Sequence, residues 1–130
     1  MAARVFWSYA RSDREFAHRC ANLLEAEGTS VFLPDRDIAP GEEWQERTRD
    51  ALRSADAVIV VLSEAALRSN LVLMELGAAW ATDKPIIPII PPNENIPDRI
   101  PVPLDGVAML RTSSLSDAAI ATTLRESLAA

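Results

Sequence analysis

The stretch Ala57-Val58-Ile59-Val60-Val61-Leu62 contains six apolar residues in a row, with no polar residue alternating between them. A strand with one face in water alternates between apolar and polar side chains, whereas a strand covered on both faces is apolar throughout. The stretch therefore predicts a central strand of a parallel sheet with helices against both faces. Ser63 ends this apolar run.

Amphipathic segments and shorter apolar runs alternate around the predicted central strand. Helical spacing of apolar residues predicts helices over 13–27 and 44–55, and the pair Ser69-Asn70 is suited to cap a third helix. The segment Ser12 to Glu15 has the capping-box pattern that should start the first helix, and residues 35–41 are expected to form a loop. The other strands and the last helix are expected at 5–7, 31–33, 86–90, 107–110 and from 116 onward.

Five strands joined by helical crossovers predict a doubly wound, flavodoxin-like α/β fold with strand order 2-1-3-4-5 and helices on both faces. Ligands of such sheets bind beyond the carboxyl ends of the strands, where this chain places the segments Ser8 to Arg11, Pro34 to Gly41 and Ser63 to Glu75. Pro88 lies inside the fourth predicted strand and donates no backbone hydrogen bond. It therefore needs a bulge or a position that faces away from a neighbouring strand.

The composition predicts one compact domain over residues 1–130. The chain is 48% hydrophobic and carries a net charge of −6 at pH 7. An acidic chain lacks the excess of Lys and Arg that nucleic acids and anionic membranes attract, so neither is an expected partner. The chain has no run of about 18 apolar residues and no leader pattern, and its single cysteine, Cys20, fits a reducing compartment. These features favour a cytoplasmic location.

Several chemistries lack the residues that they need. A phospho-receiver of this topology needs an acidic pair after the first strand and an aspartate after the third, where this chain has Ser8-Tyr9 and Leu62-Ser63. No glycine-rich phosphate loop follows the first strand. His18 has no cysteine or carboxylate at ligand spacing, so neither a metal site nor a Ser-His triad is expected. We interpret His18 as a residue on the surface of the first helix.

Glu75 is the only charged residue in the apolar segment Ser69 to Trp80. Burial of an unpaired carboxylate costs on the order of a few kcal/mol. Glu75 must therefore face a cleft, pair with a buried cation, or hold another group in place. A cleft position makes it a candidate active-site group, and the alternative is a glutamate at the rim of a core helix that reaches water.

Five segments share their order and spacing with one known family: Phe6-Trp7-Ser8-Tyr9-Ala10-Arg11-Ser12-Asp13, Val31-Phe32-Leu33, Ile38-Ala39-Pro40-Gly41-Glu42-Glu43-Trp44, Val60-Val61-Leu62-Ser63 and Glu75-Leu76. Together they resemble a Toll/interleukin-1 receptor (TIR) domain of the bacterial type. The resemblance implies a flavodoxin-like fold and one of two functions, NAD+ hydrolysis in bacterial anti-phage immunity or signalling, or protein scaffolding. It also implies that the domain is the N-terminal effector part of a longer protein.

In the enzymatic TIR proteins, the helix after the third strand carries a catalytic glutamate, and Glu75 matches it by position. Cleavage between ribose and nicotinamide releases a neutral leaving group from a cationic ring, so it needs no general acid, unlike glycosidases with two carboxylates. A fixed carboxylate near the anomeric carbon would stabilise the oxocarbenium-like ribose. We expect the nearby helix N-terminus to help keep Glu75 ionised. NAD+ is then the substrate, and no cofactor or metal is expected.

The resemblance implies further contacts with NAD+. Tyr9 and Arg11 match the segment that contacts the nicotinamide ribose and the phosphates, and a solvated Arg11 is an equal alternative. Trp44 is either a stacking partner for a base or a core residue, and Ser63 either touches the ligand or caps a helix. The expected substrate-binding residues are Ser8, Tyr9, Arg11, Asp35, Arg36, Trp44, Ser63 and Leu71.

Two positions depart from the family pattern. Pro34 stands where the family places an acid directly after the second strand, which moves the acid to Asp35. Leu71 stands where many members place a tryptophan, four residues before the catalytic glutamate. The departures imply different substrate packing, with a cyclised ADP-ribose product, weak activity or no activity as the options. Trp7 and Trp80 are interpreted as packing residues, with an interface as the other option for Trp80.

The alternative function is a non-catalytic binding module. The loop Asp35 to Gly41 resembles the family's docking loop, through which the domain would join other TIR domains in a homo-oligomer or filament. Both functions are compatible, because in the enzymatic family the loop of one copy often completes the cleft of the next. A nucleoside deoxyribosyltransferase, which has a similar sheet and a catalytic glutamate, is a third and poorer interpretation.

Overall fold

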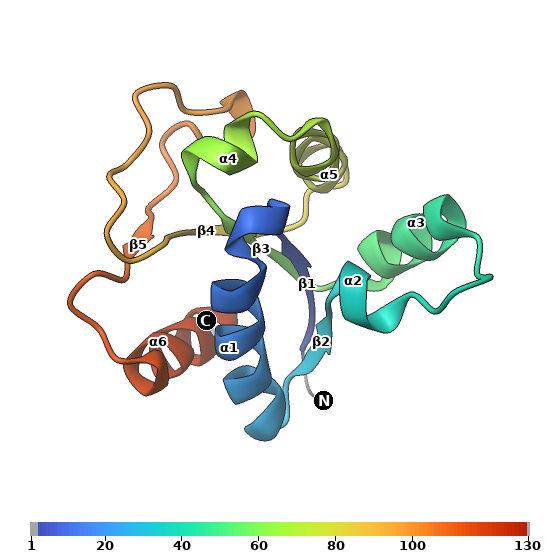
Figure 1. The fold of residues 1–130 in the computed structure, drawn as a ribbon, viewed down its shortest axis with the longest axis horizontal. Coiled ribbons are helices and arrows are strands. Elements are labelled where there is room, and N and C mark those ends of the chain that lie inside the picture. The colour runs from blue at the N-terminus through green and yellow to red at the C-terminus, as the bar shows by residue number, and fades with distance from the viewer. Residues whose placement is uncertain (1–2, 130) are drawn as a thin grey trace.

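The computed structural model describes residues 3–129, and its centre is a five-stranded sheet (Figure 1). The strands lie in the order β2-β1-β3-β4-β5, and every adjacent pair is parallel. This order and direction confirm the predicted flavodoxin-like fold. The strands are β1 Arg4–Ser8, β2 Ser30–Phe32, β3 Ala57–Val61, β4 Ile86–Ile90 and β5 Leu110–Arg111.

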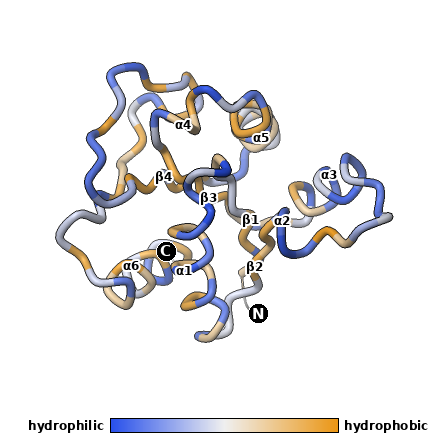
Figure 2. The backbone as a smooth tube through the Cα atoms, in the orientation of Figure 1, coloured by the Kyte–Doolittle hydropathy of each residue, from blue (hydrophilic) through white to orange (hydrophobic). Residues whose placement is uncertain are grey.

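Helices cover both faces of the sheet. The helices α1 and α6 pack together on one face, and α4 and α5 lie on the other, where α3 packs against β1 and α5 (Figure 1). The most hydrophobic stretches of the chain include the strands, which lie between these layers (Figure 2). The helices are α1 Arg14–Ala26, α2 Pro34–Asp37, α3 Trp44–Ser54, α4 Glu64–Leu67, α5 Asn70–Ala81 and α6 Asp117–Ala129, with the 3-10 turns η1 Arg11–Asp13 and η2 Val102–Leu104.

The strand β3 lies at the middle of the sheet, and all five of its residues are buried, as its sequence predicts. Ile59 packs towards α1 and α6, whereas Val60 packs towards α5. Neighbouring residues of β3 therefore serve two separate parts of the core, which explains why no polar residue interrupts the strand.

Two serine caps set the helices that follow β3. Ser63 Oγ accepts a hydrogen bond from the Ala66 N–H (3.0 Å) and starts α4, and Ser69 Oγ accepts one from the Val72 N–H (3.2 Å) and starts α5. The short α4 thus precedes α5, and Glu75 falls in the second turn of α5, on the side that faces the sheet.

The predicted capping box at the start of the first helix is wrong. The chain first makes the turn η1, and Asp13 at the N-cap of α1 forms no capping hydrogen bond. The Asp13 carboxylate instead accepts a hydrogen bond from the Ser63 hydroxyl, fifty residues away. Ser12 lies inside η1 and not at the N-cap of α1, so it is not placed to form the box.

Two element boundaries also differ from prediction. Residues 34–37 form the single helical turn α2 where a loop was expected, because Pro34 suits the first position of a helix. The strand β5 covers 110–111 and not 107–110, and it pairs only with the end of β4. Such edge strands carry a weak sequence signal because few of their residues are buried.

Pro88 takes a position that suits proline. Val58 N–H donates to the Pro85 carbonyl and Leu62 N–H donates to the Ile89 carbonyl, so the alternate residues 85, 87 and 89 face β3. Pro88 therefore faces β5, whose pairing begins only with Ile89 and Leu110. The missing N–H of Pro88 costs no ladder hydrogen bond with β3.

The proline-rich segment that follows β4 contains no further helix or strand before η2. The helices α1 and α6 have 13 residues each. Within residues 3–129, no helix combines the length and the apolar character that crossing a membrane would require.

Candidate functional site

A cavity of about 500 Å³ lies where β1 and β2 end. Three parts of the chain line it: the end of β1 with η1 and the start of α1, the segment from α2 to the start of α3, and α5. This is the edge at which sheets of this topology bind ligands, and the volume is in the range of small-molecule sites. The lining residues are Trp7, Tyr9, Arg11, Arg14, Pro34, Asp35, Ile38, Trp44, Leu71 and Glu75.

Glu75 is almost completely buried, with 2% of its surface exposed, and it lines this cavity. The Ser8 hydroxyl, at the end of β1, donates a hydrogen bond of 2.7 Å to Glu75 Oε1. Oε2 has no hydrogen-bond partner among the described residues. A buried carboxylate oxygen without a donor is uncommon, because buried polar atoms are almost always partnered.

Burial raises the pKa of Glu75 to about 7, and the hydrogen bond from Ser8 only partly opposes this. The expectation that the helix N-terminus keeps this acid ionised is therefore wrong. Glu75 is the sixth residue of α5, beyond the first turn to which the favourable effect of a helix N-terminus is confined. Near neutral pH the carboxyl is present in both its protonated and its ionised form, so small changes around it shift its charge.

Several residues that the sequence singled out lie on the walls of the cavity. Trp44 is 41% exposed at the start of α3, so the alternative of a core tryptophan is wrong. Arg11 is exposed in η1 and forms no ion pair within residues 3–129. Leu71 lies one turn before Glu75 on α5. Tyr9 directly follows β1, and its hydroxyl donates to the Asp35 carboxylate.

The structure does not bring Arg36 and Ser63 to the cavity. Arg36 points towards α1, where its two terminal nitrogens donate to the Glu25 carboxylate at 2.9 and 3.0 Å. Ser63 is buried as the cap of α4 and also donates to Asp13. Both residues are engaged in structural contacts, and their expected contact with a ligand stays a prediction.

Sequence reasoning missed four lining residues and one close neighbour. Arg14, Pro34 and Ile38 line the cavity, although only the segment containing the last two was singled out. Trp7 lines it as well and is buried in the core, in line with its interpretation as a packing residue, whereas Trp80 is 59% exposed, so its position at an interface stays a prediction. His18 lies 2.9 Å from Asp35 Oδ1, a partner that sequence spacing does not reveal.

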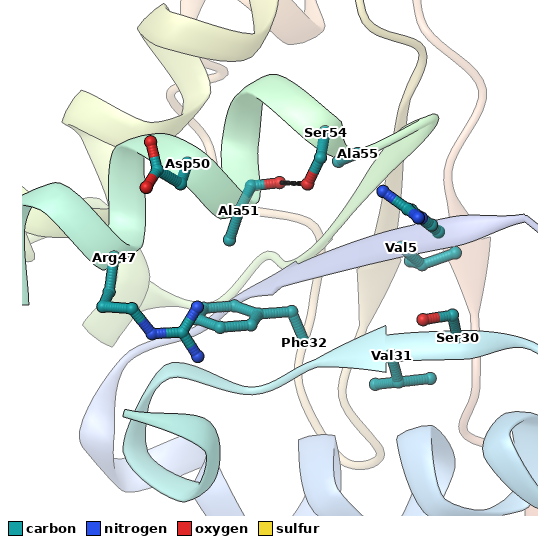
Figure 3. Close-up of a pocket in the computed structure, with 10 residues that line it drawn as sticks. Val5, Ser30, Val31, Phe32, Arg47, Asp50, Ala51, Ser54 and Ala55 are labelled. Atoms are coloured by element: carbon teal, nitrogen blue, oxygen red, sulfur yellow. Dashed lines mark hydrogen bonds between the residues drawn. The ribbon is translucent and has the colours of Figure 1, made fainter. Parts of the chain in front are cut away.

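A second hollow, of about 310 Å³, lies between α3 and the strands β1 and β2 (Figure 3). The guanidinium of Arg47 lies over the Phe32 ring, 5.4 Å from its centroid, and the Ser54 hydroxyl donates to the Ala51 carbonyl (3.3 Å). The only carboxylate among its lining residues, Asp50, is exposed. This hollow has no buried unpartnered acid, so the cavity with Glu75 is the better candidate site.

The described part of the chain, residues 3–129, contains no cluster of three or more His, Cys, Asp or Glu side chains suited to hold a metal ion. The cavity carries only Asp35 and Glu75 as possible oxygen ligands.

The parallel sheet defines a doubly wound α/β domain, and the cavity lies at the carboxyl edge of its strands. Its sequence places it further: the family model of the TIR domain matches residues 5–126, and the chain belongs to this family. The family comprises signalling and protein-interaction modules that associate with other TIR domains. No protein with curated annotation matches the chain.

Solved structures agree on the fold. The TIR domain of the Toll-related receptor TRR-2 from Hydra magnipapillata has a TM-score of 0.78 and 25% identity, over 99% of this chain and 100% of that one. A metazoan TIR-STING receptor from C. gigas, in complex with 2′,3′-cGAMP, has a TM-score of 0.77 and 21% identity, over 98% of this chain and 40% of that one. Another structure of a C. gigas TIR-STING receptor has a TM-score of 0.66 and 24% identity, over 83% and 37%.

Proposed function

We propose that this TIR domain is an NAD+ glycohydrolase that cleaves the bond between nicotinamide and ribose, with Glu75 as its catalytic residue. The observation that carries the proposal is the Oε2 atom of Glu75, which is buried, has no partner and belongs to an acid that lines a cavity of about 500 Å³. Keeping such an acid costs stability, and sites that retain a costly group are commonly functional.

The proposed chemistry needs one carboxylate. The carbon–nitrogen bond breaks with both electrons moving to the pyridinium nitrogen, so nicotinamide leaves as a neutral molecule. The ribose carbon becomes electron-poor, and ionised Glu75 stabilises that charge and accepts a hydrogen bond from a ribose hydroxyl at Oε2. Water then adds to the ribose carbon and loses a proton to solvent, which gives ADP-ribose. Attack by the adenine of the same molecule would give a cyclic isomer.

The walls of the cavity suit the rest of the dinucleotide. Arg11 is exposed and forms no ion pair within residues 3–129, so it is available for a pyrophosphate. Trp44 presents an indole at the rim, where a base can stack. Leu71 and Ile38 supply apolar surface. NAD+ is the substrate in this proposal, and the reaction uses no cofactor.

A direct test is to incubate the concentrated protein with NAD+ and to follow nicotinamide by chromatography. Glu75→Gln keeps the size of the side chain and removes its charge, so we expect release to fall by at least about 100-fold. The control is Glu126→Gln, an exposed glutamate on α6 that does not line the cavity, and it should keep full activity. Release that persists in Glu75→Gln would refute the proposed role of this acid.

The second candidate function is an interaction module without catalysis. The second half of the expected docking loop, residues 39–41, and residues 42–43 before α3 are all exposed, as a docking loop requires. We propose that this loop joins copies of the domain and that the domain acts in a cytoplasmic protein with further parts. Gly41 has a φ of +90°, so Gly41→Asp strains the loop and should weaken self-association on a sizing column. Self-association without any nicotinamide release would favour this function over the enzyme.

A further inference from the structure

Four side chains form a second polar cluster beside the cavity, separate from the pair Ser8 and Glu75. Its centre is Asp35 in α2. The Tyr9 hydroxyl and Arg14 Nε both donate to the Asp35 carboxylate, and His18 Nε2 lies 2.9 Å from Oδ1. The Tyr9 and His18 rings meet edge to face, with 5.9 Å between their centroids. We call these four residues the Asp35 cluster.

The Asp35 cluster joins parts of the chain that are far apart in sequence. Tyr9 follows β1, Arg14 and His18 lie one turn apart on α1, and Asp35 belongs to α2. A single exposed ion pair contributes little, but one carboxylate with three donors fixes the relative position of three segments. Burial favours a higher pKa for Asp35, but the hydrogen bonds from Tyr9, His18 and Arg14 outweigh it and lower the pKa to about 2.

The cluster also shapes the cavity. Tyr9, Arg14 and Asp35 line it, whereas His18 stands behind them and does not. The chain that continues from Asp35 supplies Ile38 and Trp44 to another part of the wall. A shift of α2 away from α1 would therefore move the Tyr9 side and the Trp44 side of the cavity relative to each other.

Tyr9 and Asp35 have pKa values far from neutrality, in opposite directions. Burial, the hydrogen bond to Asp35 and its charge all raise the pKa of Tyr9, so its hydroxyl remains protonated at neutral pH. Asp35 remains ionised there, because its pKa is about 2. Tyr9 and Asp35 therefore keep one protonation state near pH 7, and their contacts join β1, α1 and α2.

We propose that Asp35 and His18 are positioning residues, which hold the Tyr9 ring at the cavity and fasten α2 to α1 so that the wall formed by Ile38 and Trp44 keeps its binding shape. Only the expected effect of these residues on the KM for NAD+ rests on the proposed function. The structural part of the proposal stands independently. The sequence departs from the family pattern at this point, since Pro34 moves the acid by one residue to Asp35.

The test compares Asp35→Asn with Asp117→Asn. Asp117 pairs with Arg19 (3.2 Å) between α6 and α1, away from the cavity, so it controls for the same chemical change in an exposed ion pair. We expect Asp35→Asn to speed trypsin cleavage after Arg36 and Arg47 several-fold. It should also raise the KM for NAD+ about tenfold while kcat changes less, because a charge-assisted contact that positions the wall is lost. Asp117→Asn should change neither quantity.

A pair of His18 variants separates positioning from bulk stability. His18→Gln keeps a donor near Asp35 and should retain most of the wild-type KM, whereas His18→Ala should raise it. If the wild-type protein releases no nicotinamide, the proposed function fails, and the trypsin comparison alone decides this proposal. Cleavage of Asp35→Asn at the wild-type rate, or an unchanged KM in an active enzyme, would overturn it.

Discussion

Two acids line the cavity: Glu75 of α5, whose position we call the floor, and Asp35 of α2, whose position we call the wall. They differ in the number of hydrogen bonds that they receive. Glu75 on the floor receives one hydrogen bond, from Ser8, and keeps one oxygen without a partner. Asp35 on the wall receives hydrogen bonds from three side chains. Burial works to raise the pKa of both acids, yet the pKa of Glu75 is raised to about 7 and that of Asp35 is lowered to about 2.

The difference teaches how one cavity holds one acid with a pKa near neutrality and another that stays ionised. Hydrogen-bond donors stabilise the ionised form, so an acid with three donors stays charged and holds its neighbours in place. An acid with one donor in a buried site retains an unused acceptor and a pKa close to the working pH. The number of donors distinguishes the two roles here, because both acids line the same cavity.

The largest expected effect is that of Glu75 on the free energy of unfolding. The carboxyl of Glu75 titrates at 4.5 when unfolded and at about 7 when folded, so the folded protein holds the extra proton between these values. The free energy of unfolding therefore falls as the pH rises from about 4.5 to 7, by up to about 3 kcal/mol. Glu75→Gln should remove this loss and make the protein more stable at pH 8, as measured by urea unfolding.

At pH 4 the wild-type protein and Glu75→Gln should have similar free energies of unfolding, because the acid is then neutral in both states. A variant that is less stable than wild type at pH 8 would show that the ionised form of Glu75 is well accommodated, and it would remove the contrast with Asp35.

The next effect concerns the single donor to Glu75. Ser8→Ala removes the hydrogen bond that opposes burial, so the pKa of Glu75 should rise further above 7. Nicotinamide release should depend on the ionised form and thus rise with pH, with a midpoint near 7 in the wild type. In Ser8→Ala we expect the midpoint to move up by about one unit and the rate at pH 7 to fall up to tenfold. Ser69→Ala, which loses only the cap of α5, should keep the wild-type midpoint.

In urea unfolding, removing the charge of Asp35 should destabilise the protein, whereas removing that of Glu75 should stabilise it. Asp35→Asn weakens three hydrogen bonds and should lower the free energy of unfolding at pH 7 by about 1 kcal/mol. Asp35 stabilises the folded protein above its unfolded pKa of 3.8, and this stabilisation is lost as the pH falls through about 2. The difference between wild type and variant in urea unfolding should therefore shrink between pH 4 and pH 2. A constant difference over this range would contradict the account of the wall.

The smallest effect is expected from Leu71, an apolar residue that lines the cavity. Leu71→Ala removes part of the apolar surface of the cavity, so the KM for NAD+ should rise about two- to threefold, which corresponds to roughly 0.5 kcal/mol. The midpoint of the pH profile should stay at the wild-type value. A shifted midpoint would mean that Leu71 controls the burial of Glu75, and it would connect the wall to the floor.

Much of this arrangement is visible in the sequence. The unbroken apolar run of β3 predicts a central parallel strand, and Glu75 stands out as the only charge in an apolar helix. The family resemblance names the same residue. Signals of this kind are local, because they depend on the periodicity of neighbouring side chains.

Other contacts could not be predicted from the sequence, because the two partners are far apart along the chain. The Asp13 carboxylate accepts a hydrogen bond from the Ser63 hydroxyl, and Arg36 turned away from the cavity to pair with Glu25. His18 looked like an isolated surface residue until α2 placed Asp35 beside it. No spacing rule along the chain reports which of several charged neighbours a flexible side chain will choose.

The sequence alone determined the parallel α/β sheet and its strand order, since burial patterns and crossovers leave few ways to fold such a chain, and it singled out Glu75 as an isolated charge. Only the tertiary structure decided the charge of that acid and the task of Asp35. The pKa of Glu75 depends on its burial and on Ser8, 67 residues away, and the contact between Asp35 and Tyr9 spans 26 residues. Electrostatics is set by distance in space, which the fold alone provides.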